Sequence, residues 1–259
     1  MIEVNFSLQT KLALRKDKQG QELLISSPKS ISEIELSKLS LFHIPKGISE
    51  CMIKGCDVFE DGRIVFADFS FNNKRLVVLN ADYSLNKEIP FDERPIDVTI
   101  VESNTVAVTL FEMKDIHIVD VRSSKIIRTI ALNKKCYGIY FTGGKLNVCL
   151  EQNVMKTIDL SGNTLKTISQ MGPATYCSVT NDLVYYSVYG CDAVYCCDLN
   201  GNVQWKFSCS KSDFPNGIAH DASGNVFVTC RDANKVIVIA SNGKESRILL
   251  SSGDGLQNR

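Results

Sequence analysis

The sequence has few of the residues that build zinc modules and disulfide scaffolds. Its 259 residues include three histidines and ten cysteines, and no two cysteines form a CxxC pair. Zinc fingers and RING modules need Cys and His ligands at close, regular spacing, so this pattern excludes them. Most of the cysteines stand inside strand-like apolar runs, where a reduced thiol behaves as a small apolar side chain. We therefore expect no disulfide framework.

Long apolar runs and an excess of either charge are also missing. No apolar run approaches the roughly 20 residues that span a bilayer, and the N-terminal residues contain no apolar core of signal-peptide length. We therefore expect a cytoplasmic protein. Lys plus Arg equals Asp plus Glu at 29 each, so no global electric field attracts the chain to DNA or to an anionic membrane. We expect neither as a partner.

What the sequence does contain is a repeated pattern of short strands, clearest between residues 214 and 244. There, turn residues such as Ser223-Gly224-Asn225 bracket short β-branched runs such as Val226-Phe227-Val228, which is typical of antiparallel hairpins. Equivalent second strands begin at Ile64, Val106, Leu146, Leu183 and Val226. By subtraction these starts differ by 42, 40, 37 and 43 residues, the period of four-stranded propeller blades.

The third strand of each unit keeps the same period, and no long amphipathic helix interrupts it. These strands are 76–79, 116–119, 154–158, 194–197 and 236–239. The pattern predicts an all-β protein, a six-bladed β-propeller of four-stranded antiparallel blades. We assign residues 51–259 to this domain, as five full repeats and the start of a sixth at Gly253–Leu256. Residues 1–50 form an N-terminal extension, in which Leu39–Ile44 is the expected outer strand of an incomplete sixth blade.

Two units carry a more specific signature. One is Asn216-Gly217-Ile218-Ala219 followed by Asp221 and Gly224–Val228, and the other is Gly62–Asp68. These phrases resemble the NHL repeat of TolB-like propellers. With Ser252–Leu256, they make most of the chain similar to the C-terminal propeller of tripartite-motif (TRIM-NHL) proteins, especially the versions expanded in molluscs.

The resemblance implies a binding platform for proteins or, in some members, for RNA. In that family a RING finger, B-boxes and a coiled coil supply ubiquitin-ligase activity, and none of these modules is present in this sequence. We therefore expect the substrate-recognition part of a ubiquitin-ligase-like protein, as a fragment of a longer product or as a free-standing propeller.

The leading prediction is a non-catalytic protein-interaction propeller that is not an enzyme and holds no cofactor or metal. One alternative is binding of single-stranded RNA by the cations Arg94, Lys134, Lys135, Arg231 and Lys235. A second is a metal-dependent lactonase-like propeller, with Asp57, Asp97 and Asn216 as oxygen ligands at equivalent blade junctions. No GxSxG, phosphate-binding glycine loop or HExxH motif supports another chemistry.

The candidate partner-binding residues lie in the loops after second strands and at the blade junctions, which share one face of a propeller. Tyr and Arg are typical of binding hot spots, although an aromatic residue here also fits simple packing between blades. The candidates are Phe71, Arg94, Phe111, Lys135, Tyr137, Tyr176, Tyr189, Phe214 and Arg231.

Overall fold

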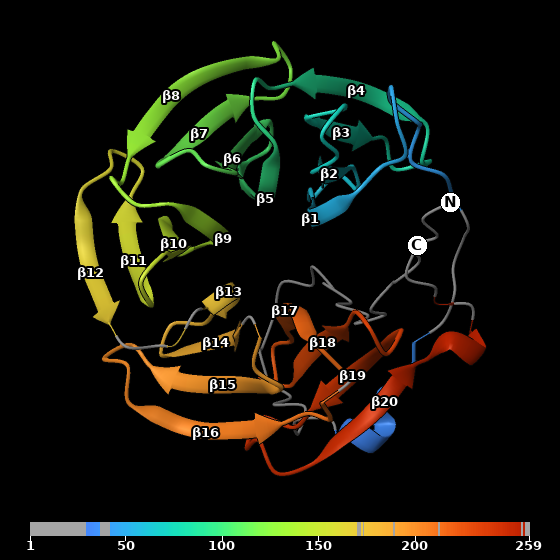
Figure 1. The fold of residues 1–259 in the computed structure, drawn as a ribbon, viewed down its shortest axis with the longest axis vertical. Coiled ribbons are helices and arrows are strands. Elements are labelled where there is room, and N and C mark those ends of the chain that lie inside the picture. Colours follow the sequence, from blue (N-terminus) through green and yellow to red (C-terminus); the bar gives the residue numbers. More distant parts are fainter. Residues whose placement is uncertain are drawn as a thin grey trace, which may run out of the picture.

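The computed structural model describes residues 30–36, 42–169, 172, 174–188, 190–211, 213–254 and 256. In these ranges the strands form five four-stranded antiparallel sheets, arranged around an axis like propeller blades (Figure 1). Within each sheet the strand order follows the sequence. The prediction of an all-β propeller with four-stranded blades is therefore confirmed, whereas the prediction of six blades is wrong, because the structure has five.

The strands of each blade run from the axis outward in sequence order. Blade 1 contains β1 (Ile53–Val58), β2 (Ile64–Asp68), β3 (Arg75–Leu79) and β4 (Leu85–Pro90). Blade 2 contains β5 (Pro95–Glu102), β6 (Thr105–Leu110), β7 (Asp115–Asp120) and β8 (Lys125–Ala131). Blade 3 contains β9 (Cys136–Thr142), β10 (Lys145–Leu150), β11 (Val154–Asp159) and β12 (Thr164–Ser169). Blade 4 contains β13 (Ala174–Val179), β14 (Leu183–Val188), β15 (Ala193–Asp198) and β16 (Val203–Ser208). Blade 5 contains β17 (Pro215–His220), β18 (Val226–Cys230), β19 (Lys235–Ile239) and β20 (Ser246–Leu250).

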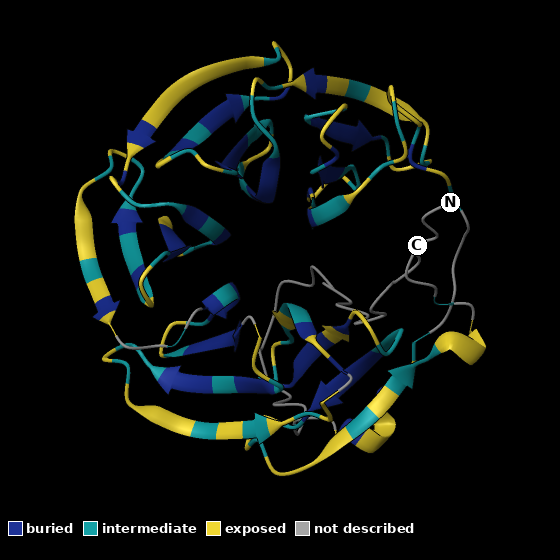
Figure 2. Ribbon diagram, viewed as in Figure 1, coloured by how far each residue is buried: buried dark blue, intermediate teal, exposed yellow. Residues whose placement is uncertain are grey.

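The middle strands are the most apolar because neighbouring blades cover both of their faces. Every residue of β3 is buried, whereas β8 is exposed at all but one position. Figure 2 shows the same gradient around the ring, with exposed residues concentrated on the outermost strands. Continuous apolar runs such as Leu76–Leu79 fit this two-sided burial. This is why the second and third strands were readable from the sequence.

Each blade packs its apolar face on the next blade. One cluster joins blades 1 and 2, a second joins blades 2 and 3, a third joins blades 3 and 4, and a fourth joins blades 4 and 5. Among the described residues, no apolar cluster contains side chains of both blade 5 and blade 1. The first and last blades therefore each present an outer face that something else must cover.

Two N-terminal segments cover these faces in place of a sixth blade. Ile31 and Ile34, in and after the 3-10 helix η1 (Ile31–Glu33), pack on Phe227 and Val238 of blade 5. Ile44, with Phe42, Cys51 and Ile53, packs on Phe66, Val77 and Leu79 of blade 1. These short covers bury the apolar faces without building a sheet.

The strand expected at Leu39–Ile44 is wrong where the structure can be compared with it. Residues 42–44 are not in a strand, and residues 39–41 lie outside the described residues. At the other end, the expected start of a sixth blade contains the 3-10 helix η2 (Ser252–Asp254). Gly255 also lies outside the described residues.

A buried polar network fixes the cover of blade 1. The carboxylate of Asp68, at the end of β2, accepts hydrogen bonds from the Met52 amide and the Asn73 side chain, and pairs with Arg75 Nε at 3.2 Å. Arg75 also donates to the Pro45 carbonyl at 2.5 Å. The asparagine exchanges two hydrogen bonds with the Ser49 backbone. These bonds tie residues 45–52 to the sheet.

The structure also describes the cysteines and the length of the helices. All ten cysteines lie in the described part of the chain, and each is a free thiol there. In the described part of the chain, no helix has the length and apolar character needed to cross a bilayer.

We expect the substitution Arg75→Ala to destabilise the fold by about 3 kcal/mol, because it leaves the fully buried Asp68 carboxylate without its cation. Urea unfolding measures this change. The matched control is Lys46→Ala, which removes an exposed pair with Glu50 and should cost far less stability, because solvent screens an exposed ion pair. Equal losses in the two variants would contradict the structural role of Arg75.

Candidate functional site

The inner strand of every blade contains a β-bulge at the same place. The register shifts by one residue near the start of β1, β5, β9, β13 and β17, where each strand gains a residue over its neighbour. The strand pairing makes Ile53, Pro95, Cys136, Ala174 and Pro215 equivalent, each opposite the last residue of a second strand. Bulges commonly redirect a side chain next to a functional site.

The residue after each of these positions lines one cavity at the mouth of the central channel. These five bulge residues are Lys54, Ile96, Tyr137, Thr175 and Asn216. A second set lining the cavity follows the second strands directly and consists of Phe69, Phe111, Glu151 and Arg231. The equivalent position in blade 4, Tyr189, lies outside the described residues. Among the described residues, the cavity is thus built from the repeat itself, by two equivalent positions in blades 1, 2, 3 and 5 and by one in blade 4.

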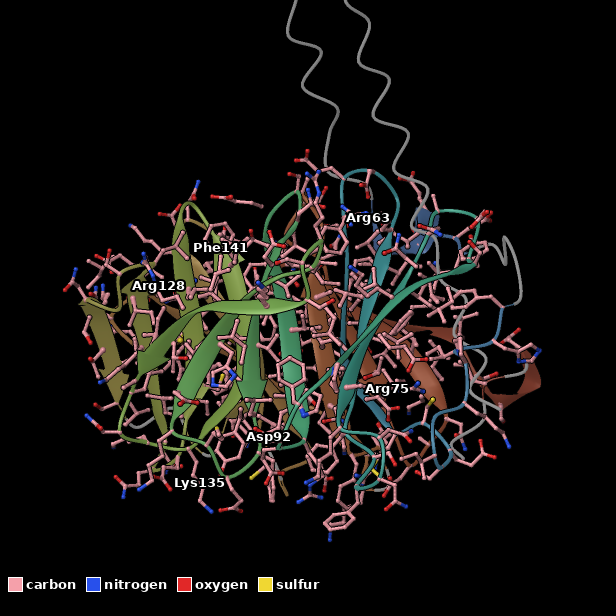
Figure 3. The ribbon with its side chains drawn as sticks, turned by 90° about the horizontal axis from the view of Figure 1, so that it is seen from above. Arg63, Arg75, Asp92, Arg128, Lys135 and Phe141 are labelled. Carbon is pink, nitrogen blue, oxygen red and sulfur yellow. The ribbon has the colours of Figure 1, made fainter. Side chains whose placement is uncertain are left out.

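The cavity has a volume of about 410 Å³ and receives side chains from all five blades. One aromatic residue comes from each blade, namely Phe69, Phe111, Tyr137, Tyr176 and Phe214. Apolar walls with a few polar groups are typical of ligand pockets. The blade junctions that carry Asp92 and Lys135 lie at one end of the propeller, whereas Arg63 and Phe141 lie at the opposite end (Figure 3). The cavity opens at the end marked by Lys135.

Of the nine candidate residues, five line this cavity. They are Phe111, Tyr137, Tyr176, Phe214 and Arg231. Arg94 lies beside it, with its guanidinium 4.4 Å from the Phe69 ring and 4.3 Å from the Phe111 ring. Lys135 is paired with Glu112 at 2.5 Å. Tyr189 lies outside the described residues. Whether these residues bind a partner stays a prediction.

The placement of Phe71 differs from expectation. Phe71 is 70% exposed and does not line the cavity, whereas Phe69 does. Because β2 ends at Asp68 and β6 at Leu110, Phe69 is the equivalent of Phe111. Aligning the last residues of the second strands would have identified it. The same alignment would have found Lys54, since it is equivalent to Tyr137.

Tyr176 crosses the channel beneath the cavity. Its hydroxyl, carried by β13 of blade 4, donates to the Lys54 carbonyl of β1 at 3.0 Å. Glycines on the other inner strands make room at this level: a Cβ at Gly55 would lie 2.2 Å from Asp97 Oδ1, and a Cβ at Gly138 would lie 2.6 Å from the Thr175 carbonyl oxygen. The inner strands therefore approach more closely than side chains would allow.

The channel carboxylates bind the backbone of the next blade. Asp57 Oδ2 accepts from the Ile100 amide, and Asp97 Oδ2 accepts from the Ile139 amide, both at 2.9 Å. Burial raises the pKa of both side chains, that of Asp97 to about 7. The two residues are not at equivalent positions, because Asp57 lies level with Thr99, which donates to it at 3.3 Å.

This geometry corrects the expected ring of metal ligands. Asp57 and Asp97 occupy different levels, and Asn216 lies in the wall of the cavity. Within the described residues, no group of three or more His, Cys, Asp or Glu side chains is placed to hold a metal ion. The three residues of the lactonase-like alternative therefore do not occupy equivalent positions.

No protein-family model matches this chain, and no curated protein matches it. Solved structures do resemble it. Virginiamycin B lyase from Staphylococcus aureus aligns with a TM-score of 0.60 and 17% identity over 76% of this chain and 69% of the lyase. A streptogramin B lyase aligns with a TM-score of 0.62 and 14% identity over 79% and 70%. Glutaminyl cyclase from Myxococcus xanthus aligns with a TM-score of 0.54 and 14% identity over 69% and 85%.

These similarities establish the β-propeller fold and correct one prediction. We expected that the chain is not an enzyme, but the similar structures are those of enzymes, a lyase and a cyclase. That finding contradicts the expectation, because the structures that share this fold are those of enzymes. None of the comparisons supports the narrower resemblance to tripartite-motif or NHL proteins.

The raised pKa of Asp97 predicts a pH-dependent stability. The unfolded carboxyl titrates near pH 4 and the folded one near pH 7. Between these pH values the native state holds one more proton than the unfolded state. The contribution of this proton to the free energy of unfolding is lost as the pH rises from about 4 to about 7. We expect the unfolding free energy of the wild type, relative to Asp97→Asn, to fall by at most about 1.4 kcal/mol per pH unit.

Urea unfolding of both proteins across this pH range measures the difference. The control Asp61→Asn changes an exposed carboxyl whose pKa is lowered by the Arg63 amide. Its unfolding free energy, relative to Asp97→Asn, should therefore still fall as the pH rises. Parallel pH profiles for wild type and Asp97→Asn would contradict the assignment.

Proposed function

We propose that this propeller binds a protein partner at the cavity face, through the residues that the five inner-strand bulges and the adjoining loops direct there. The observation that carries the proposal is the cavity of about 410 Å³ with one aromatic residue from each blade. Buried aromatic residues in a pocket are typical binding hot spots. The resemblance to tripartite-motif propellers favours the same role, with the partner as the substrate of a ubiquitin ligase.

The charges on this face favour a protein over RNA. Four of the five cations considered for RNA binding are paired with carboxylates: Arg94 with Glu93, Lys135 with Glu112, Arg231 with Asp232 and Lys235 with Asp213. The fifth, Lys134, donates to the Gln152 side chain. Phosphate binding depends on cations that release counterions from the nucleic acid, and pairing with carboxylates reduces that gain. Aromatic residues among balanced charges fit a polypeptide better.

The proposal concerns recognition of the partner. In a propeller that is an enzyme, this recognition precedes catalysis. The cavity would hold the bound segment against the inner strands, just above the Tyr176 hydroxyl and Asp97.

The test is selection of random peptides displayed on phage against the wild-type protein, followed by affinity measurement with the purified peptides. We expect Phe214→Ala to weaken binding by at least about tenfold, because it removes a cavity aromatic that is 39% exposed. The matched control is Phe71→Ala, an exposed aromatic on the same face outside the cavity, which should change affinity less than about twofold.

Two results would overturn the proposal. One is that all selected peptides bind Phe214→Ala as tightly as wild type while Phe71→Ala weakens them. The other is that no peptide binds but a single-stranded oligouridine does, with an affinity that falls steeply with salt.

A further inference from the structure

One cation of the cavity, Lys54, has no ion-pair partner among the described residues. Lys54 is the only charged member of the five bulge residues. No carboxylate among the described residues pairs with its ammonium, which lies 5.7 Å from the centre of the Phe69 ring. Burial lowers the pKa of Lys54, and the nearby Arg231 lowers it further. A half-buried amine facing a second cation is costly unless an anion joins it.

The cation nearest to Lys54 is paired, whereas Lys54 is not. Arg231, which follows β18 in blade 5, lies 5.7 Å from the Phe214 ring and pairs with Asp232 at 2.6 Å. The only carboxylate among the described cavity residues is Glu151 of blade 3. Among the described residues, neither Asp232 nor Glu151 forms an ion pair with Lys54.

The floor of the cavity limits what can enter it. The hydrogen bond from the Tyr176 hydroxyl to the Lys54 carbonyl joins blades 4 and 1 across the channel. Tyr176 therefore lies in the path of a chain that enters from the cavity face. An internal segment would have to turn back inside about 410 Å³, whereas a chain end would not.

We propose that the cavity binds the C-terminal end of a partner polypeptide, with the free α-carboxylate at Lys54 and an apolar last side chain against the aromatic wall. This inference rests on the proposed partner-binding function and adds the chemistry of the bound segment. The Lys54 ammonium donates to the carboxylate. The apolar wall consists of Ile96, Phe111, Tyr137, Leu150 and Val188.

The test uses a fluorescein-labelled peptide, Gly-Ser-Gly-Ser-Gly-Phe, with either a free C-terminal acid or a C-terminal amide. Fluorescence anisotropy measures its affinity for the full chain. We expect the acid to bind at least about tenfold more tightly than the amide, as a charge-assisted hydrogen bond predicts. Lys54→Gln should abolish this preference, and Lys54→Arg should retain much of it. A third peptide, with an internal glutamate and a C-terminal amide, tests an acidic side chain as the source of the carboxylate.

The matched control is Lys114→Gln, which removes the same charge from an exposed position in the loop after β6, outside the cavity. It should leave the preference unchanged. Thermal unfolding of each variant shows whether it is folded. If Lys54→Gln is not folded, Lys54→Arg still tests the inference. Equal affinity for acid and amide would overturn the inference, and so would a preference that survives Lys54→Gln or an internal-glutamate peptide that binds as tightly as the acid.

The two proposals fail in different ways. If selected peptides depend on Phe214 but show no preference for a free C-terminus, partner binding stands and the inference about Lys54 falls. If no peptide of any kind binds, the proposed function itself falls.

Discussion

The structure depends on one packing requirement, which is that each four-stranded sheet has two apolar faces and can bury neither alone. Four interfaces between successive blades satisfy most of this need. The outer faces of blades 1 and 5 are left over. The segments around Ile44 and around Ile31 cover them, so residues before the first strand stabilise both ends of the array. A buried ion pair at Asp68 and Arg75 then fixes one cover in place.

Because the blades repeat, the same bulge recurs in every inner strand, and together the bulges form a site. A single bulge would redirect one side chain, but five bulges at equivalent positions bring five side chains to one cavity. The chemistry of the cavity follows from which residue each repeat places there. Ile96 and Tyr137 make its wall apolar, whereas Lys54 adds a cation. Below this level, Asp57 and Asp97 bind backbone amides of the next blade, so their carboxylates serve to hold neighbouring blades together.

Much of the site was readable because the repeat period places equivalent residues on one face. Phe111, Tyr137, Tyr176, Phe214 and Arg231 were selected on that basis and line one cavity. Lys54 was missed, because the inner strands carry weak apolar patterns and a bulge leaves no signal in a single repeat. Phe69 was missed because Phe71, two residues further along the same loop, was chosen instead. The register of β1 places Lys54 in the bulge.

The sequence by itself determined the β-propeller with four-stranded blades, because continuous apolar runs at a period of about 40 residues can be buried only between neighbouring sheets. It also determined which loops share a face. The tertiary structure decided the number of blades, because the residues at the two ends lack a repeat and their packing on blades 1 and 5 is not a local property. It decided the cavity as well, since Lys54 and Arg231 are separated by most of the chain and meet only when the array curves around its axis.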